Sequence, residues 1–204
     1  MKERKRFCIM AHPRSGTHQA SAILRAYGYD VLHETEMGQD GISSWLFCIE
    51  NPQWGPDPDK YRFIDRIHLV RNPVMVISSM LRCVPDGVAE YMDRVAGIRH
   101  KSGHTVRAVE RYLFWHKLIR SKEPNMIVKV EDFSEHMSKH LGKWPPLIME
   151  PTNIREHMMG VNVAQNPHVM TNLTVTDIES ALAGREEMYH EFRGLCAYYR
   201  YSVA

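Results

Sequence analysis

The chain has 204 residues, of which 44% are hydrophobic and 25% are charged, a balance that excludes a disordered or fibrous protein. Its 26 Lys and Arg against 24 Asp and Glu give a net charge of +2, without the basic excess of a dedicated nucleic-acid-binding domain. The four cysteines are scattered and form no CxxC pair, which favours free thiols in a reducing compartment. No apolar stretch approaches the roughly 20 residues that cross a bilayer. We therefore expect one cytoplasmic domain over residues 1–204, with no membrane span and no nucleic-acid partner.

The beginning of the chain predicts a strand, a turn, a helix and a second strand. The apolar run Phe7–Ala11 is short and is followed by Pro13, as in a buried parallel strand. Residues Thr17–Tyr27 carry apolar side chains at helical spacing and stop at Gly28, which is typical of a helix that ends at a glycine. A second strand is expected over Asp30–His33. This order of elements opens an α/β fold with a right-handed crossover.

The remaining patterns continue the alternation of strands and helices. In order, we expect a proline-rich loop over Asn51–Asp59, a third strand over Arg66–Val70, a helix over Val74–Leu81 begun by Pro73, an amphipathic helix over Val106–Ile119, a fourth strand over Met126–Val130, a surface segment over Trp144–Thr171, and closing helices over Asp177–Tyr199 interrupted near Gly184. Crossover helices cover both faces of a parallel sheet. The sequence thus predicts a three-layer α/β/α domain with a parallel sheet.

The segment between the first strand and its helix, His12–His18, has the composition of a phosphate-binding loop. Gly16 lets the backbone curl so that successive N–H groups point at an anion, and the following helix adds its positive dipole end. Arg14 supplies a planar, permanently charged donor, and Ser15 or Thr17 adds a hydroxyl. The segment does not match GxxxxGK[ST], which disfavours magnesium-dependent ATP hydrolysis and kinase chemistry. The alternative is an ordinary strand-to-helix turn capped by Ser15 or Thr17.

A second anion site is predicted after the third strand. Arg71 leaves the end of that strand, Pro73 begins the next helix, and Ser79 follows about two turns into it. Ligands of open α/β sheets bind outside the carboxyl ends of the strands, so we expect Arg71 and the first loop to converge on one edge. Two such sites suit a ligand with two separated phosphate-type groups. Alternatively, Arg71 caps its strand and Ser79 bonds back to its own helix.

These two motifs resemble those of the PAPS-dependent sulfotransferase family, in its small bacterial and carbohydrate-type branch. Pro13–Thr17 (PRSGT) is similar to the loop that binds the 5′-phosphosulfate, and Arg71–Ser79 (RNPVMVISS) to the 3′-phosphate motif. Val128–Phe133 resembles a later strand segment in which Val130 stands where the family often has a tyrosine. The resemblance implies a P-loop-like sulfotransferase fold that uses 3′-phosphoadenosine 5′-phosphosulfate (PAPS), releases adenosine 3′,5′-bisphosphate (PAP) and requires no metal. It assigns cofactor binding to Pro13, Arg14, Ser15, Gly16, Thr17, His18, Arg71 and Ser79.

Sulfuryl transfer requires charge stabilisation on the leaving phosphate oxygen and a base for the acceptor's proton. We expect Arg14 to stabilise the leaving group. The resemblance allows either Glu or His as the base, and the end of the second strand offers both. Our order of preference is Glu34, then His33, then Glu36. The alternative for this segment is a solvated acidic turn.

The acceptor is expected to be a hydroxyl or amine of a small molecule or carbohydrate, bound by loops over residues 35–60, 84–105 and 145–172. Gly41–Trp45 is a candidate wall of the acceptor pocket, with Trp45 either a ring platform or a buried core residue. His100, Lys101 and His104 indicate a mobile basic loop, and Asn153–His157 is a further segment that could reach the pocket.

The 12 histidines do not form a zinc motif, because the HETE sequence is not HExxH and no other pair has ligand spacing with a third ligand. We therefore expect no metal site. Two other function classes stay open. One is a P-loop-like, nucleotide-dependent phosphotransferase, and the other is a non-catalytic nucleotide-binding protein that keeps the phosphate cradle but lacks a working base.

Overall fold

The computed structural model describes residues 1–99, 102–146 and 173–202. The chain divides into two units, one formed by Met1–Arg71 with Leu118–Met158 and the other by Asn72–Lys117 with Met159–Ala204. The single domain expected over residues 1–204 stays a prediction. Among the described residues, no helix combines the length and the hydrophobicity needed to span a membrane.

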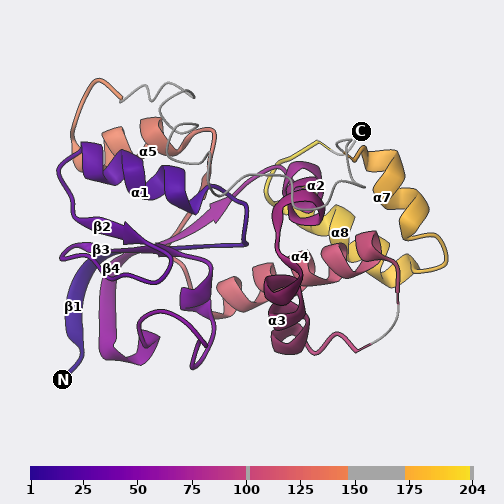
Figure 1. Ribbon diagram of the computed structural model, residues 1–204. Coiled ribbons are helices and arrows are strands. Elements are labelled where there is room, and N and C mark those ends of the chain that lie inside the picture. Colours follow the sequence, from indigo (N-terminus) through magenta and orange to yellow (C-terminus); the bar gives the residue numbers. More distant parts are fainter. Residues whose placement is uncertain (100–101, 147–172, 203–204) are drawn as a thin grey trace. The chain divides into compact units, whose positions relative to one another are not determined.

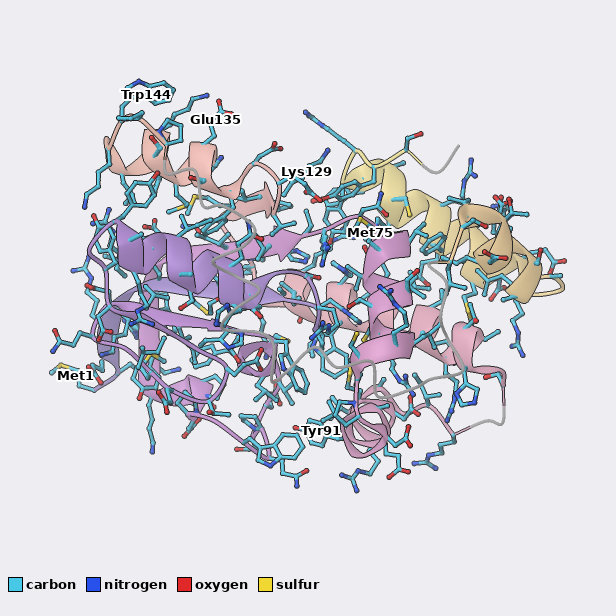
Figure 2. All side chains as sticks on the ribbon, turned by 45° about the horizontal axis from the view of Figure 1, so that its top comes forward. Met1, Met75, Tyr91, Lys129, Glu135 and Trp144 are labelled. Atoms are coloured by element: carbon cyan, nitrogen blue, oxygen red, sulfur yellow. The ribbon has the colours of Figure 1, made fainter. Side chains whose placement is uncertain are left out.

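The first unit contains a five-stranded, entirely parallel sheet with the strand order β2-β3-β1-β4-β5 (Figure 1). Its strands are β1 (Glu3–Ala11), β2 (Val31–His33), β3 (Gly41–Ser44), β4 (Tyr61–Val70) and β5 (Met126–Lys129). Because every strand runs in the same direction, all their carboxyl ends lie at one edge. Figure 2 labels Lys129 at the end of β5, and Met1 at the other end of the sheet. The predicted α/β class and parallel sheet are confirmed.

Both faces of the sheet are buried. On one face, α1 (Thr17–Ala26) and α5 (Phe133–Leu141) lie side by side (Figure 1). This face forms a core with the two helices, which includes Phe7, Ile9, Ala11, Ile67, Leu69 and Val128 from the strands and Ala20, Ile23, Leu24, Phe133 and Met137 from the helices.

The intervening residues of β1 point to the opposite face, and there Cys8 and Met10 are buried as well. A short 3₁₀ turn, η1 (Leu46–Cys48), contacts β1, and a second one, η2 (Pro58–Lys60), precedes β4. Burial on both sides explains why the Phe7–Ala11 part of β1 is continuously apolar rather than alternating. The arrangement is consistent with the predicted three-layer architecture.

Asn125 extends the hydrogen bonding of β5 along the edge of β4. Strand β5 itself pairs with β4 only between Ile67 and Val70. Just before it, the Asn125 backbone N–H donates to the Arg66 carbonyl over 2.9 Å. The Asn125 side-chain oxygen accepts from the Arg66 N–H over 2.7 Å, and its amide nitrogen donates to the Ile64 carbonyl over 2.9 Å. One asparagine thus satisfies three backbone groups of a strand edge.

The second unit is helical. It comprises α2 (Pro73–Cys83), α3 (Asp86–Ala96), α4 (His104–Ser121, whose end from Leu118 belongs to the first unit), α7 (Val175–Ala181) and α8 (Glu186–Tyr198). Figure 2 labels Met75 on α2 and Tyr91 on α3. Asn72 caps α2 because its side chain accepts from two first-turn N–H groups, over 3.0 and 3.3 Å, and Pro73 occupies the first helical position as predicted.

A buried ion pair joins α3 to α4 in the second unit. Arg111 donates to both carboxylate oxygens of Asp93, over 2.6 and 2.7 Å. Arg107 lies 3.3 Å from the same carboxylate. Both partners of the closer pair are buried, with Asp93 8% and Arg111 5% exposed. The two-point contact compensates the cost of removing two charges from water.

Most predicted elements are confirmed with moderately shifted ends, and two are corrected. Gly41–Ser44 forms the buried strand β3, within a range predicted to be an acceptor loop, and α3 occupies much of the loop predicted over residues 84–105. The predictions for His100, Lys101 and Asn153–His157, and most of the surface segment Trp144–Thr171, fall outside the described residues.

Candidate functional site

The loop between β1 and α1 has the backbone geometry of an anion-binding nest. Arg14 and Gly16 both adopt left-handed conformations, with φ of +74° and +92°. The Ser15 N–H donates to the His12 carbonyl over 3.1 Å and closes a turn. No side chain in the described residues caps α1 at Gly16, so the alternative of a side-chain-capped turn does not hold. N–H groups at the start of a helix that lacks a side-chain cap are the groups that bind anions in such loops.

Ser15 adds an unused hydroxyl to this loop. Its side chain is completely buried, and its Oγ has no hydrogen-bond partner within the described parts of the chain. Leaving a buried hydroxyl without a partner costs free energy, and such groups are rare in native structures. This hydroxyl is an independent indication that the loop is built to meet a polar ligand.

Val130 closes the loop from the side of β5. A Cβ placed on Gly16 would lie only 2.5 Å from the Val130 Cγ2, so glycine is required here for space as well as for its positive φ. The residue that follows β5 thus packs directly on the turn of the phosphate-type loop. Sequence patterns identified the glycine but not the contact that demands it.

Arg71, at the end of β4, meets the same loop. Its Nη1 donates to the Arg14 carbonyl oxygen over 3.2 Å. The predicted convergence of Arg71 with the first loop is therefore observed. One guanidinium carries five N–H donors, so this single bond leaves donors for a ligand while it fixes the guanidinium beside the loop.

The other predicted cofactor residues are placed as follows. Pro13 is buried in the turn, and its carbonyl lies 2.6 Å from the His12 Nδ1. His18 is half-buried in the first turn of α1. Ser79 is buried in α2, in the second unit, so its predicted partnership with Arg71 stays a prediction.

Thr17, His33 and Glu34 form a cluster beside the loop. The Thr17 Oγ1 lies 2.9 Å from the His33 Nε2 and donates to the Glu34 Oε1 over 3.4 Å. The His33 Nε2 and the Glu34 Oε1 are themselves 3.1 Å apart. The His18 ring stands edge-on to that of His33, with centroids 5.2 Å apart. The two preferred base candidates therefore lie together at the start of α1, with 29% and 27% of their side chains exposed.

Ser43 of β3 holds this cluster in place and was missed by the sequence patterns. Its hydroxyl donates to the Thr17 carbonyl over 2.7 Å, and its carbonyl accepts from the Glu34 N–H over 3.0 Å. Glu34 adopts a left-handed conformation with φ of +61°, which a non-glycine residue takes only at a cost. The sequence shows a serine in the segment after the second strand, but nothing in its spacing indicates that it contacts Thr17 and Glu34.

Two predicted residues are not brought into the cluster. Glu36 is exposed and has no hydrogen bond or ion pair with the described part of the chain. Trp45 is 8% exposed and follows the interior strand β3, which favours a core residue over a ring platform.

Within residues 1–99, 102–146 and 173–202, no group of three or more His, Cys, Asp or Glu side chains has the arrangement of a metal site. Comparison of the chain with protein-family models, with curated proteins and with solved structures finds no match. In this site a loop with nest-like backbone, contacted by the Arg71 guanidinium, lies beside a paired imidazole and carboxylate.

Proposed function

We propose that the chain is a PAPS-dependent sulfotransferase with a P-loop-like sulfotransferase fold. It would move a sulfuryl group to a hydroxyl or amine of a small-molecule or carbohydrate acceptor. The observation that carries the proposal is the contact between the two motifs, in which the Arg71 guanidinium lies 3.2 Å from the Arg14 carbonyl. A ligand that bears a 5′-phosphosulfate and a separate 3′-phosphate has a group for each.

The residues of the loop fit the phosphosulfate end of such a ligand. Its backbone N–H groups, the Arg14 guanidinium and the Ser15 hydroxyl, which has no partner among the described residues, are all donors, and oxyanions are acceptors only. Arg71 would meet the 3′-phosphate, and the binding of this phosphate by Ser79 stays a prediction. When bound, PAPS supplies the activated sulfuryl group and the leaving phosphate.

The chain's own residues would then perform three tasks. The loop holds the donor in line with the acceptor, since transfer between fixed groups depends on alignment. Arg14 stabilises the charge that develops on the phosphate oxygen as the S–O bond to it breaks. Glu34, paired with His33, accepts the proton that the acceptor loses as its oxygen or nitrogen bonds to sulfur.

Calorimetric titration with PAP, AMP and ATP–magnesium tests the proposal. We expect tight binding of PAP and weak binding of AMP, because only PAP has the 3′-phosphate. Arg71→Ala is expected to weaken PAP binding about 10- to 100-fold, since a hydrogen bond to a charged group contributes about 1.5–3 kcal/mol. Arg62→Ala is the matched control, because Arg62 is exposed on the same strand and lies outside the loop.

A preference for ATP–magnesium would favour the phosphotransferase alternative and overturn the proposal. Equal affinity for PAP and AMP would mean that Arg71 only caps its strand. PAP binding with no sulfuryl transfer to a panel of phenols, amines and sugars, all assayed with PAPS, would favour a non-catalytic nucleotide-binding protein.

A further inference from the structure

Thr17 stands between the anion loop and the proposed base, and it has only one proton to give. Thr17 is the first residue of α1, whose start has no side-chain cap among the residues that the structure describes. Its hydroxyl donates to the Glu34 Oε1 over 3.4 Å and lies 2.9 Å from the His33 Nε2. A hydroxyl has a single O–H donor and can accept at the same time. The proton that Thr17 gives to Glu34 is therefore not available to an anion in the loop.

The anion and Glu34 compete for the single proton of the Thr17 hydroxyl, because both are hydrogen-bond acceptors. An oxyanion has no proton, so it bonds to Thr17 only if Thr17 donates. An ionised Glu34 also only accepts. His33 is different, because its ring nitrogen can donate to Thr17 or to Glu34, which lies 3.1 Å away. His33 can thus satisfy Glu34 or Thr17 while the hydroxyl changes partner.

Resting on the proposed function, we propose that Thr17 is a positioning residue that couples anion occupancy of the loop to release of the Glu34 carboxylate. Without an anion, Thr17 donates to Glu34 and occupies one of its acceptor positions. With an oxyanion bound, the Thr17 hydroxyl turns to it, and Glu34 is left with the His33 N–H. A carboxylate that loses a hydrogen-bond donor is a better proton acceptor.

This coupling means that the donor binds in the loop before Glu34 can accept a proton. Glu34 becomes available for the acceptor's proton once the donor is in the loop, and it is occupied otherwise. The Glu34 N–H donates to the Ser43 carbonyl, and this bond holds the Glu34 backbone in a positive-φ conformation that a non-glycine residue disfavours. The backbone in turn places the carboxylate beside Thr17. Such outliers persist where surrounding structure fixes them.

Coupling between two sites is reciprocal, so it can be measured by anion affinity alone, without knowing the acceptor. PAP affinity would be measured by calorimetry for the wild type, Glu34→Ala, Thr17→Val and the double variant. Removing Glu34 frees the Thr17 proton and removes a nearby negative charge, so we expect PAP to bind about tenfold more tightly. In the Thr17→Val background only the charge effect is left, and we expect about a twofold gain. The difference is about fivefold, or about 1 kcal/mol.

Two matched variants isolate the hydroxyl. Glu36→Ala removes the same charge two residues away from an exposed side chain, and its effect is expected to be the same with Thr17 or with Thr17→Val. Thr17→Ser keeps the hydroxyl and is expected to restore the coupling with Glu34. Circular dichroism checks that each variant is folded, and Thr17→Ala replaces Thr17→Val if the latter is not.

The outcomes separate the coupling from the function on which it rests. Failure of the wild type to bind PAP would overturn the proposed function itself. If PAP binds but Glu34→Ala has equal effects in both Thr17 backgrounds, the function stands and the coupling is refuted. Coupling that is as large for Glu36→Ala would also refute it, because a general charge effect would then explain the result.

Discussion

Gly16 is the residue on which the shape of the anion loop depends most directly, and Gly16→Ala tests this. Its φ of +92° costs an alanine about 1–2 kcal/mol. The added Cβ would also lie 2.5 Å from the Val130 Cγ2, about 1 Å closer than an ordinary contact, and overpacking of this kind costs about 1–3 kcal/mol. We expect Gly16→Ala to lower the free energy of unfolding by about 2–5 kcal/mol, measured by urea denaturation followed by circular dichroism.

Gly28→Ala is the matched control for this experiment. Gly28 has nearly the same φ, +89°, but apart from its chain neighbours no atom of the described residues lies within 4 Å of the position that its Cβ would take. Its cost is expected to be the conformational part alone, about 1–2 kcal/mol. Val130→Ala should also be less costly in the Gly16→Ala background than in the wild type, because it relieves the clash. Equal costs for the two glycine variants, or additive effects of Gly16 and Val130, would refute the reasoning.

Three further predictions concern stability and reactivity. Burial lowers the pKa of His68 from 6.5 to about 3, so between these two pH values the unfolded chain binds a proton that the folded chain does not. The free energy of unfolding should therefore fall below pH 6.5 by up to about 1.4 kcal/mol per pH unit. The His68→Phe variant should lack this contribution to the slope. Asp93→Asn should destabilise the protein by about 3–5 kcal/mol in urea, because it leaves the Arg111 charge buried and uncompensated. Of the four thiols, only the half-buried Cys83 should react with Ellman's reagent in the native protein, since the others are buried and burial raises the pKa of Cys196 to about 12.

Each of these expectations has a result that contradicts it. An unchanged pH slope in His68→Phe would mean that this imidazole does not titrate on unfolding. A loss below about 0.5 kcal/mol in Asp93→Asn, the range of ordinary surface substitutions, would mean that the ion pair does not hold α3 to α4. Modification of a second thiol before unfolding would contradict the burial pattern, and so would an unchanged amount of reactive thiol in the Cys83→Ser variant.

The strands and helices that are predicted correctly are those with one dominant sequence pattern, such as an apolar run or a terminating glycine. Phe7–Ala11 is an unbroken apolar run, Arg66–Val70 carries three branched apolar residues around His68, and α1 ends close to a glycine. The structure extends β1 and β4 backwards because the charged first half of β1 pairs with the first half of β4, with Glu3 opposite Tyr61. Strand β3 escapes prediction because two of its four residues are serines. Those serines are buried through hydrogen bonds, which hydropathy does not reveal.

The candidate site divides in the same way. The meeting of Arg71 with the first loop follows from a general rule, since the carboxyl ends of parallel strands share one edge. The placement of Glu34 follows from no such rule. It depends on a left-handed backbone and on a bond to Ser43 of a strand that was not predicted. The local sequence shows three candidate bases near the end of β2. Tertiary contacts bring only His33 and Glu34 to Thr17 within the described residues, and they leave Glu36 exposed.

The three hydrogen bonds of Asn125 also have a consequence for association between molecules. A strand edge with unpaired N–H and C=O groups can recruit a strand from another chain, which is a route to aggregation. Asn125 occupies that edge at Ile64 and Arg66, next to the exposed side chains of Ile64 and Ile127, where an apolar partner strand would otherwise bind. Asn125 thus satisfies three backbone groups in the part of β4 that β5 does not pair with, and it leaves fewer groups there for a strand of another chain.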